Sequence, residues 1–128
     1  MRIEHAGIQV KEPAKMADWY IANLGFKCVR SADAPVPVRF IADESGKVML
    51  EVYFNPDVHV PDYAGMDPLL LHMAYVCSDP GPTADRLVRA GASLISGPEI
   101  KPNGDELVML RDPWGLPIQL CRRANPMV

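Results

Sequence analysis

The chain has 128 residues with a formal net charge of −3 at pH 7, and 48% of its residues are hydrophobic while 23% are charged. This length fits one compact domain, and the scattered basic residues exclude an extended electrostatic surface for nucleic acid. No apolar run approaches the about 20 residues that a membrane-spanning helix needs, so we expect neither a nucleic-acid nor a membrane partner.

The first half of the chain predicts a strand, a helix and three more strands. Residues 2–10 alternate so that Ile8 and Val10 lie on one face and His5 lies on the other. Apolar residues at helical spacing follow Pro13, and this helix is expected to end at Gly25. The three further strands are expected at 26–30, 38–42 and 47–54.

The second half repeats this order after a proline-rich linker at 55–68. An apolar run at 69–77 predicts a strand with His72 near its start, and a helix is expected from about Pro80 to Gly91. A Gly/Pro/Asn-rich loop is expected at 97–105. The remaining strands are expected at 92–96, 106–110 and 116–122.

Equivalent residues recur at an offset of about 67 residues, which indicates an internal repeat. His5 matches His72, Asp18 matches Asp85, and Glu51 matches Gln119. The sequence therefore predicts an α+β fold in which two βαβββ modules form one cup-shaped mixed sheet with both helices on one face. We expect a single domain over 1–128, with module 1 at about 1–54 and module 2 at about 69–123.

Four side chains are expected to meet on the open face of that sheet. Alternation directs Glu51 away from the helices together with Met49 and Tyr53, and the same argument applies to Gln119 in the last strand. We expect these neighbours, with Arg39 and loop 97–105, to line the mouth of the cup. Two imidazoles (His5 and His72), the carboxylate of Glu51 and the amide oxygen of Gln119 form a plausible ligand set for Ni, Zn, Co, Mn or Fe. Read singly, each residue has an ordinary structural explanation.

Several of these features together resemble one known group of proteins. They are the doubled βαβββ unit, a histidine at the head of each copy, the helix end Leu24-Gly25-Phe26 and the closing DPWGLPIQL. Over about residues 2–122 the chain resembles the vicinal oxygen chelate superfamily, which includes glyoxalase I, methylmalonyl-CoA epimerase, extradiol dioxygenases, and fosfomycin and bleomycin resistance proteins. The resemblance places the metal positions on His5, Glu51, His72 and Gln119. Most metal-dependent members carry glutamate at the last position, so Gln119 departs from the pattern.

The resemblance implies a metal-dependent, glyoxalase-type lyase or isomerase that acts on a small substrate with vicinal oxygens. Glu51 would then be both a metal ligand and the catalytic proton shuttle. The resemblance also implies a homodimer. The alternative is a metal-free, bleomycin-resistance-like protein that binds a small molecule, and a third possibility is a regulatory or assembly subunit with an empty cup. The three cysteines lie in apolar runs, which predicts buried free thiols and a cytoplasmic location.

Overall fold

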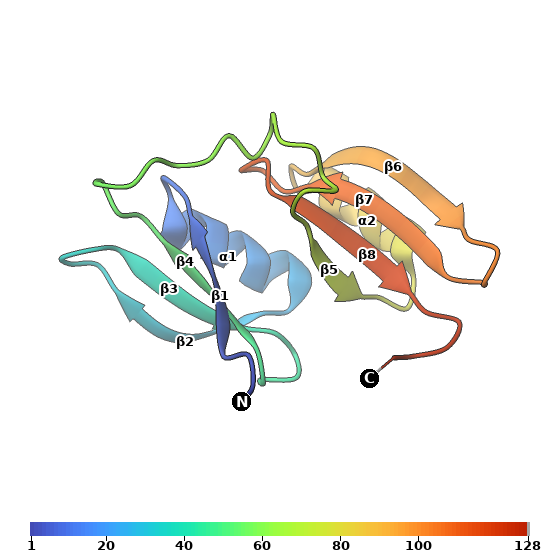
Figure 1. Cartoon of the computed structure of the whole chain (residues 1–128), viewed down its shortest axis with the longest axis horizontal. Helices are drawn as coiled ribbons and strands as arrows, with labels where there is room; N and C mark the ends of the chain where they lie inside the picture. Colours follow the sequence, from blue (N-terminus) through green and yellow to red (C-terminus); the bar gives the residue numbers. More distant parts are fainter. Residues whose placement is uncertain (128) are drawn as a thin grey trace. The chain divides into compact units, whose positions relative to one another are not determined.

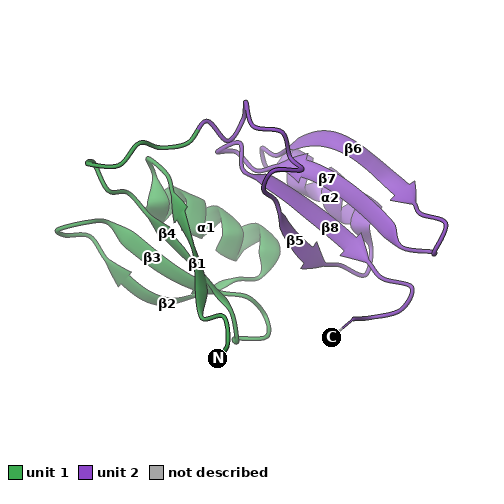
Figure 2. Cartoon of the chain, in the orientation of Figure 1, with its two compact units in different colours: residues 1–61 green, residues 62–128 purple. Residues whose placement is uncertain are grey.

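The computed structural model describes residues 1–127. The chain divides into two compact units, Met1–Pro61 and Asp62–Val128 (Figure 2). Each unit contains one helix and one four-stranded mixed sheet (Figure 1). In the described part of the chain, neither helix has the length and apolar character needed to cross a membrane.

The first unit has its strands in the order β1-β4-β3-β2, with β1 and β4 parallel and the other pairs antiparallel. The parallel pair is possible because α1 carries the chain back between the first strand and the rest of the sheet. Its elements are β1 (His5–Gln9), α1 (Pro13–Leu24), β2 (Lys27–Ala32), β3 (Val38–Ala42) and β4 (Met49–Tyr53).

The second unit has the same topology, with strand order β5-β8-β7-β6 and a parallel β5–β8 pair. Its elements are β5 (Met73–Val76), α2 (Pro80–Arg89), β6 (Ser93–Ile100), β7 (Glu106–Arg111) and β8 (Pro117–Arg122). The predicted α+β fold with two βαβββ modules is therefore confirmed, and each module builds its own sheet.

Each helix covers one face of its sheet with an apolar stripe. Helix α1 begins at Pro13 and is followed by Gly25, whose φ of 73° suits glycine, and it buries Met16 and Tyr20 against β3 and β4. Helix α2 buries Leu87 in the same way against the second sheet. Full burial of one such side chain contributes about 1.5–3 kcal/mol, so these stripes hold the helices in place. The sheets contribute Ile41, Leu50, Val52, Val108, Leu110, Ile118 and Leu120 to the two cores.

Three sequence predictions differ from the structure. The run 69–72 precedes β5 instead of belonging to it, and Leu69 and Leu70 are exposed there. Strand β6 continues to Ile100 through part of the predicted loop, because shifts of register accommodate glycine and proline in this edge strand. Cys28 is exposed on the edge strand β2, whereas the sequence predicted a buried thiol.

The linker is fixed by one polar side chain from each unit, the buried Gln9 in the first and the half-buried Arg111 in the second. In the first unit the Gln9 amide donates to the carbonyls of Asn55 (2.7 Å) and Val58 (3.0 Å) and accepts from the Asn55 amide (2.9 Å). In the second, the Arg111 guanidinium donates to the carbonyl of Tyr63 at 2.7 Å and to that of Met66 at 2.7 Å. These hydrogen bonds to the backbone order both ends of the linker.

Candidate functional site

His5 and Glu51 meet on the face of the first sheet that α1 does not cover. The Nε2 atom of His5 lies 3.4 Å from the Oε2 atom of Glu51, and about a third of each side chain is exposed. Leu50 and Val52, which flank Glu51 in β4, are buried on the opposite side. The predicted orientation of Glu51 is therefore confirmed, and the predicted neighbourhood of His5 and Glu51 exists within this unit.

The pairing of β1 with β4 brings these two residues together. Gly7 is the partner of Glu51 in the parallel register, and His5 lies two residues before Gly7 on the same face. Gly7 also keeps the space beside the carboxylate open. A Cβ atom at this position would meet Oε2 of Glu51 at 3.5 Å and the ring of Tyr53 at 3.4 Å, which is ordinary contact distance.

The other nitrogen of His5 is held by the preceding residue. Nδ1 of His5 lies 2.6 Å from Oε2 of Glu4. Because a carboxylate only accepts hydrogen bonds, Nδ1 carries a proton and donates a hydrogen bond to Oε2 of Glu4. In a neutral imidazole this arrangement leaves the lone pair on Nε2, the nitrogen that faces Glu51. Glu4 thus orients the imidazole of His5. The sequence analysis did not identify Glu4 as part of the site.

Phe40 and Arg30 complete the surroundings of His5. The Phe40 ring packs edge-on against the imidazole with the ring centroids 5.6 Å apart, and both residues line a pocket of about 290 Å³ with Glu4 and Met49. Their positions follow from the register, because Phe40 pairs with both Glu51 and Arg30. A sequence search for metal ligands overlooks them, since neither is a typical ligand.

Arg39 lies elsewhere, contrary to the prediction that it lines the mouth of a cup. It pairs in register with Val52, which is buried on the helix side. Its guanidinium donates to the carbonyl of Ala32 at 3.0 Å and forms an ion pair with Asp33 at 2.6 Å. Arg39 therefore braces the loop between β2 and β3.

His72 and Gln119 lie in the second unit at the equivalent positions. Gln119 pairs in register with Ala74, and His72 lies two residues before Ala74. Nδ1 of His72 lies 2.9 Å from the carbonyl oxygen of Pro68. A carbonyl only accepts, so His72 also carries its proton on Nδ1 and keeps its Nε2 lone pair available. Both histidines are thus in the same tautomer, although their acceptors differ.

This tautomer is typical of histidines that bind metal through Nε2, since the proton on the other nitrogen is usually held by a carboxylate or a carbonyl. Two ligand atoms at about 2.1 Å from one ion, at angles between octahedral and tetrahedral, are about 3.0–3.4 Å apart. The 3.4 Å between His5 and Glu51 fits that spacing. Within residues 1–127, no cluster of three or more His, Cys, Asp or Glu side chains could hold an ion. The first unit brings one histidine and one carboxylate together, at His5 and Glu51.

The family model of the Glyoxalase/Bleomycin resistance protein/Dioxygenase superfamily matches residues 2–120. The chain belongs to this superfamily. The match spans both units and includes all four predicted ligand positions. Membership agrees with the resemblance inferred from the sequence, since the vicinal oxygen chelate proteins form this superfamily. Among curated proteins, none matches the chain.

Solved structures with the superfamily fold cover nearly the whole chain. TnmS3, an antibiotic binding protein from Streptomyces sp. CB03234, is 20% identical with a TM-score of 0.73, and the match covers 97% of each chain. A member of the superfamily from Sphaerobacter thermophilus DSM 20745 is 18% identical with a TM-score of 0.76, covering 96% of this chain and 98% of that one. A glyoxalase/bleomycin resistance protein from Streptomyces sp. CB03234 is 20% identical with a TM-score of 0.65, covering 93% and 98%. At these identities the similarity establishes the fold alone.

Proposed function

We propose that this superfamily member is a divalent-metal-dependent enzyme of the glyoxalase type, acting on a small substrate with vicinal oxygens. The observation that carries the proposal is the geometry of His5. Its Nδ1 atom is committed to Glu4 at 2.6 Å, and its Nε2 atom faces the Glu51 carboxylate at 3.4 Å. An imidazole and a carboxylate in this arrangement are suited to bind a divalent cation.

Two histidine–oxygen pairs supply the ligands in this proposal, from one chain or from two copies. His5 and Glu51 form one pair, and His72 and Gln119 form the other. A divalent cation such as Ni, Zn, Co, Mn or Fe supplies Lewis acidity toward the substrate oxygens when it is bound. Gln119 contributes a neutral carbonyl and cannot take up a proton. Glu51 is therefore the one member of the set that can move a proton to or from the substrate.

Metal analysis of protein purified without chelator tests the proposal. We expect close to one divalent ion for each pair of histidines in the wild type and loss of that ion in both His5→Ala and His72→Ala. The wild type, but not Glu51→Gln, should convert an adduct of a 2-oxoaldehyde with a thiol. If the wild type and the two histidine variants bind Ni, Zn, Co and Mn equally poorly, the metalloenzyme proposal is wrong.

A second candidate is a metal-free protein that binds a small molecule. It is favoured by Gln119, which removes the second carboxylate that glyoxalase-type chemistry uses, and by the antibiotic-binding protein among the structures with the same fold. In that case chelator treatment should leave ligand binding unchanged, and His72→Ala should have no effect on metal content. Isothermal titration with aromatic antibiotics, before and after chelation, separates this candidate from the first.

We also propose that the protein is a homodimer. Val76, the last residue of the edge strand β5, is 81% exposed, and Leu69 and Leu70 are exposed shortly before this strand. Exposed apolar side chains of this size on a small protein favour association with a second copy. Sedimentation at micromolar concentration should give twice the mass of 14.1 kDa, and a monomer there would contradict the proposal.

A further inference from the structure

The turn between β6 and β7 contains a chemically reactive pair, Asn103 followed by Gly104, and both residues are exposed. The turn is closed by hydrogen bonds from the Lys101 amide to the Asp105 carbonyl and from the Gly104 amide to the Lys101 carbonyl, each at 2.8 Å. Asparagine is thermolabile, and its side-chain amide is attacked most readily by the nitrogen of a following glycine, which has no side chain to obstruct the approach. The turn is therefore a candidate site of spontaneous modification.

The structure requires glycine at position 104. Gly104 has a φ of +86°, a conformation that residues with a side chain rarely adopt. A Cβ atom there would also lie 3.1 Å from the Cβ atom of Ala124, in the C-terminal segment that follows β8. A larger residue would thus strain the turn and press on that segment. The fold therefore keeps an unhindered backbone nitrogen directly after Asn103.

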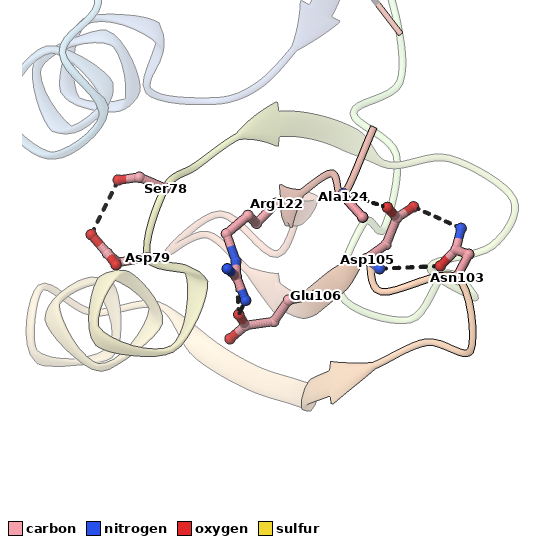
Figure 3. Close-up of polar contacts among 7 residues, drawn as sticks. All are labelled: Ser78, Asp79, Asn103, Asp105, Glu106, Arg122 and Ala124. Carbon is pink, nitrogen blue, oxygen red and sulfur yellow. Dashed lines mark hydrogen bonds and ion pairs between the residues drawn. The ribbon is translucent and has the colours of Figure 1, made fainter. Parts of the chain in front are cut away.

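The side-chain amide of Asn103 is held at both ends by Asp105. Its Oδ1 atom accepts a hydrogen bond from the backbone amide of Asp105 at 3.1 Å, and its Nδ2 atom donates to Oδ2 of Asp105 at 3.1 Å (Figure 3). Negative charge develops on Oδ1 when the Gly104 nitrogen attacks Cγ, and a backbone N–H that points at such an oxygen stabilises it. The Gly104 nitrogen must first leave its hydrogen bond to Lys101, so the reaction begins with the loss of that bond.

Asp105 also anchors the start of the C-terminal segment. This buried carboxylate accepts hydrogen bonds from Arg123 Nη1 at 2.7 Å and from the Ala124 amide at 2.9 Å. Figure 3 shows Asp105 between Asn103 and Ala124. The hydrogen bond from Arg123 is the main reason that the pKa of Asp105 lies below its usual value, and the bonds from Ala124 and Asn103 lower this pKa further. A chemical change at Asn103 therefore reaches the C-terminal segment through a single carboxylate.

We propose that Asn103 deamidates spontaneously and that the product releases the C-terminal segment from Asp105. The Gly104 nitrogen loses its proton to solvent and bonds to Cγ of Asn103, the Cγ–Nδ2 bond breaks, and Nδ2 takes up a proton and leaves as ammonia. Water then opens the resulting succinimide at either carbonyl, giving aspartate or isoaspartate. Both products carry a carboxylate in place of the neutral amide, and it repels the carboxylate of Asp105. None of these residues is a proposed metal ligand, so the inference is independent of the proposed function.

Incubation of the full chain in isotopically labelled water at mildly alkaline pH, followed by peptide mapping with mass spectrometry, tests the modification. The other asparagines are internal controls. Asn55 and Asn125 precede prolines, whose nitrogen has no proton to lose, and Asn23 precedes Leu24 within α1. We expect Asn103 to convert at least about 10-fold faster than Asn23, with oxygen from the solvent incorporated at position 103. If Asn103 converts no faster than Asn23, the proposal is wrong.

Hydrogen exchange of the Ala124 amide tests the release, because this amide donates to Asp105. We expect it to exchange at least about 5-fold faster in the incubated wild type, and in fresh Asn103→Asp, than in the fresh wild type. Asn103→Ser removes the same amide group without adding a charge, so it serves as the matched control and should exchange more slowly than Asn103→Asp. Equal exchange in the fresh and incubated wild type, or in the two variants, would mean that the new charge does not release the C-terminal segment.

Discussion

Glu51 and Gln119 occupy the same position in their two sheets. Each is paired in register with the residue that lies two places after a histidine, Gly7 after His5 and Ala74 after His72. The two halves of the proposed donor set therefore differ by a single chemical group, a carboxylate in one and an amide in the other. This difference makes Gln119 the most informative position to change.

We expect Gln119→Glu to bind divalent metal at least about 10-fold more tightly than the wild type, which corresponds to about 1.4 kcal/mol. The substitution adds a negative charge to the proposed donor set at nearly constant volume, and a charged carboxylate attracts a divalent cation more strongly than a neutral amide does. Titration with Ni, Zn, Co and Mn measures the effect. Equal and negligible affinity in both proteins would instead support the metal-free binding candidate.

Glu4→Ala should weaken metal binding by about 10-fold, because it removes the acceptor that keeps the proton on Nδ1 of His5. Nitrogen NMR of the imidazole should show a shift of His5 away from the Nδ1–H tautomer in this variant. Glu4→Gln retains an oxygen acceptor and should restore much of the tautomer. The control is Glu44→Ala, which removes an exposed glutamate from a turn of the same unit. Identical tautomer populations in Glu4→Ala and Glu44→Ala would refute the positioning role.

Gly115→Ala should destabilise the second unit by about 3 kcal/mol. Gly115 has a φ of +87°, which costs an L-residue about 1–2 kcal/mol, and a Cβ atom there would lie 2.8 Å from the backbone nitrogen of Ala64. Gly46 ends the equivalent turn of the first unit with a φ of +67° and open space around it. Gly46→Ala should therefore cost only the conformational term, about 1 kcal/mol. Urea denaturation measures both, and equal losses would mean that the contact with Ala64 is unimportant.

Asp105→Asn should lower the thermal stability of the second unit at pH 7. The pKa of Asp105 is held below its ordinary value of 3.8 by the hydrogen bonds from Arg123 and Ala124, so the charged form stabilises the folded state. This contribution is complete above about pH 4 and is lost as the pH falls through the folded-state pKa. The difference in Tm between the variant and the wild type should thus shrink as the pH is lowered below about 4.

The periodicity of the sequence predicted the elements correctly where a single face is buried. The apolar stripe that includes Met16 and Tyr20 identified α1. The alternation of buried Leu50 and Val52 placed Glu51 on the uncovered face of the sheet, because burial of one face fixes which residues of a strand point inward. Strand β6 was predicted too short. Its glycine and proline are local signals for a loop, whereas pairing with β7 at shifted register is a long-range interaction that the local sequence does not reveal.

The sequence predicted that His5 and Glu51 lie close together, but it gave no signal for the residues that surround them. His5 and Glu51 were identified through the repeat, and the structure places them 3.4 Å apart. Glu4 and Phe40 have no periodic or motif signal, since their contribution depends on a rotamer and on a cross-strand pairing. The anchoring of the C-terminal segment by Asp105 was likewise not predicted, because its partners Arg123 and Ala124 are far along the chain.

The parallel pairing of the first and last strands within each unit has a consequence for how such a chain can arise. β1 bonds to β4 and β5 bonds to β8, so neither sheet borrows a strand from the other half of the chain. A chain of half the length would therefore contain every strand of one complete sheet. Duplication and fusion of its gene would yield the present order of elements. The carboxylate at 51 and the amide at the equivalent position 119 are a difference that a symmetric pair of identical half-length chains could not contain.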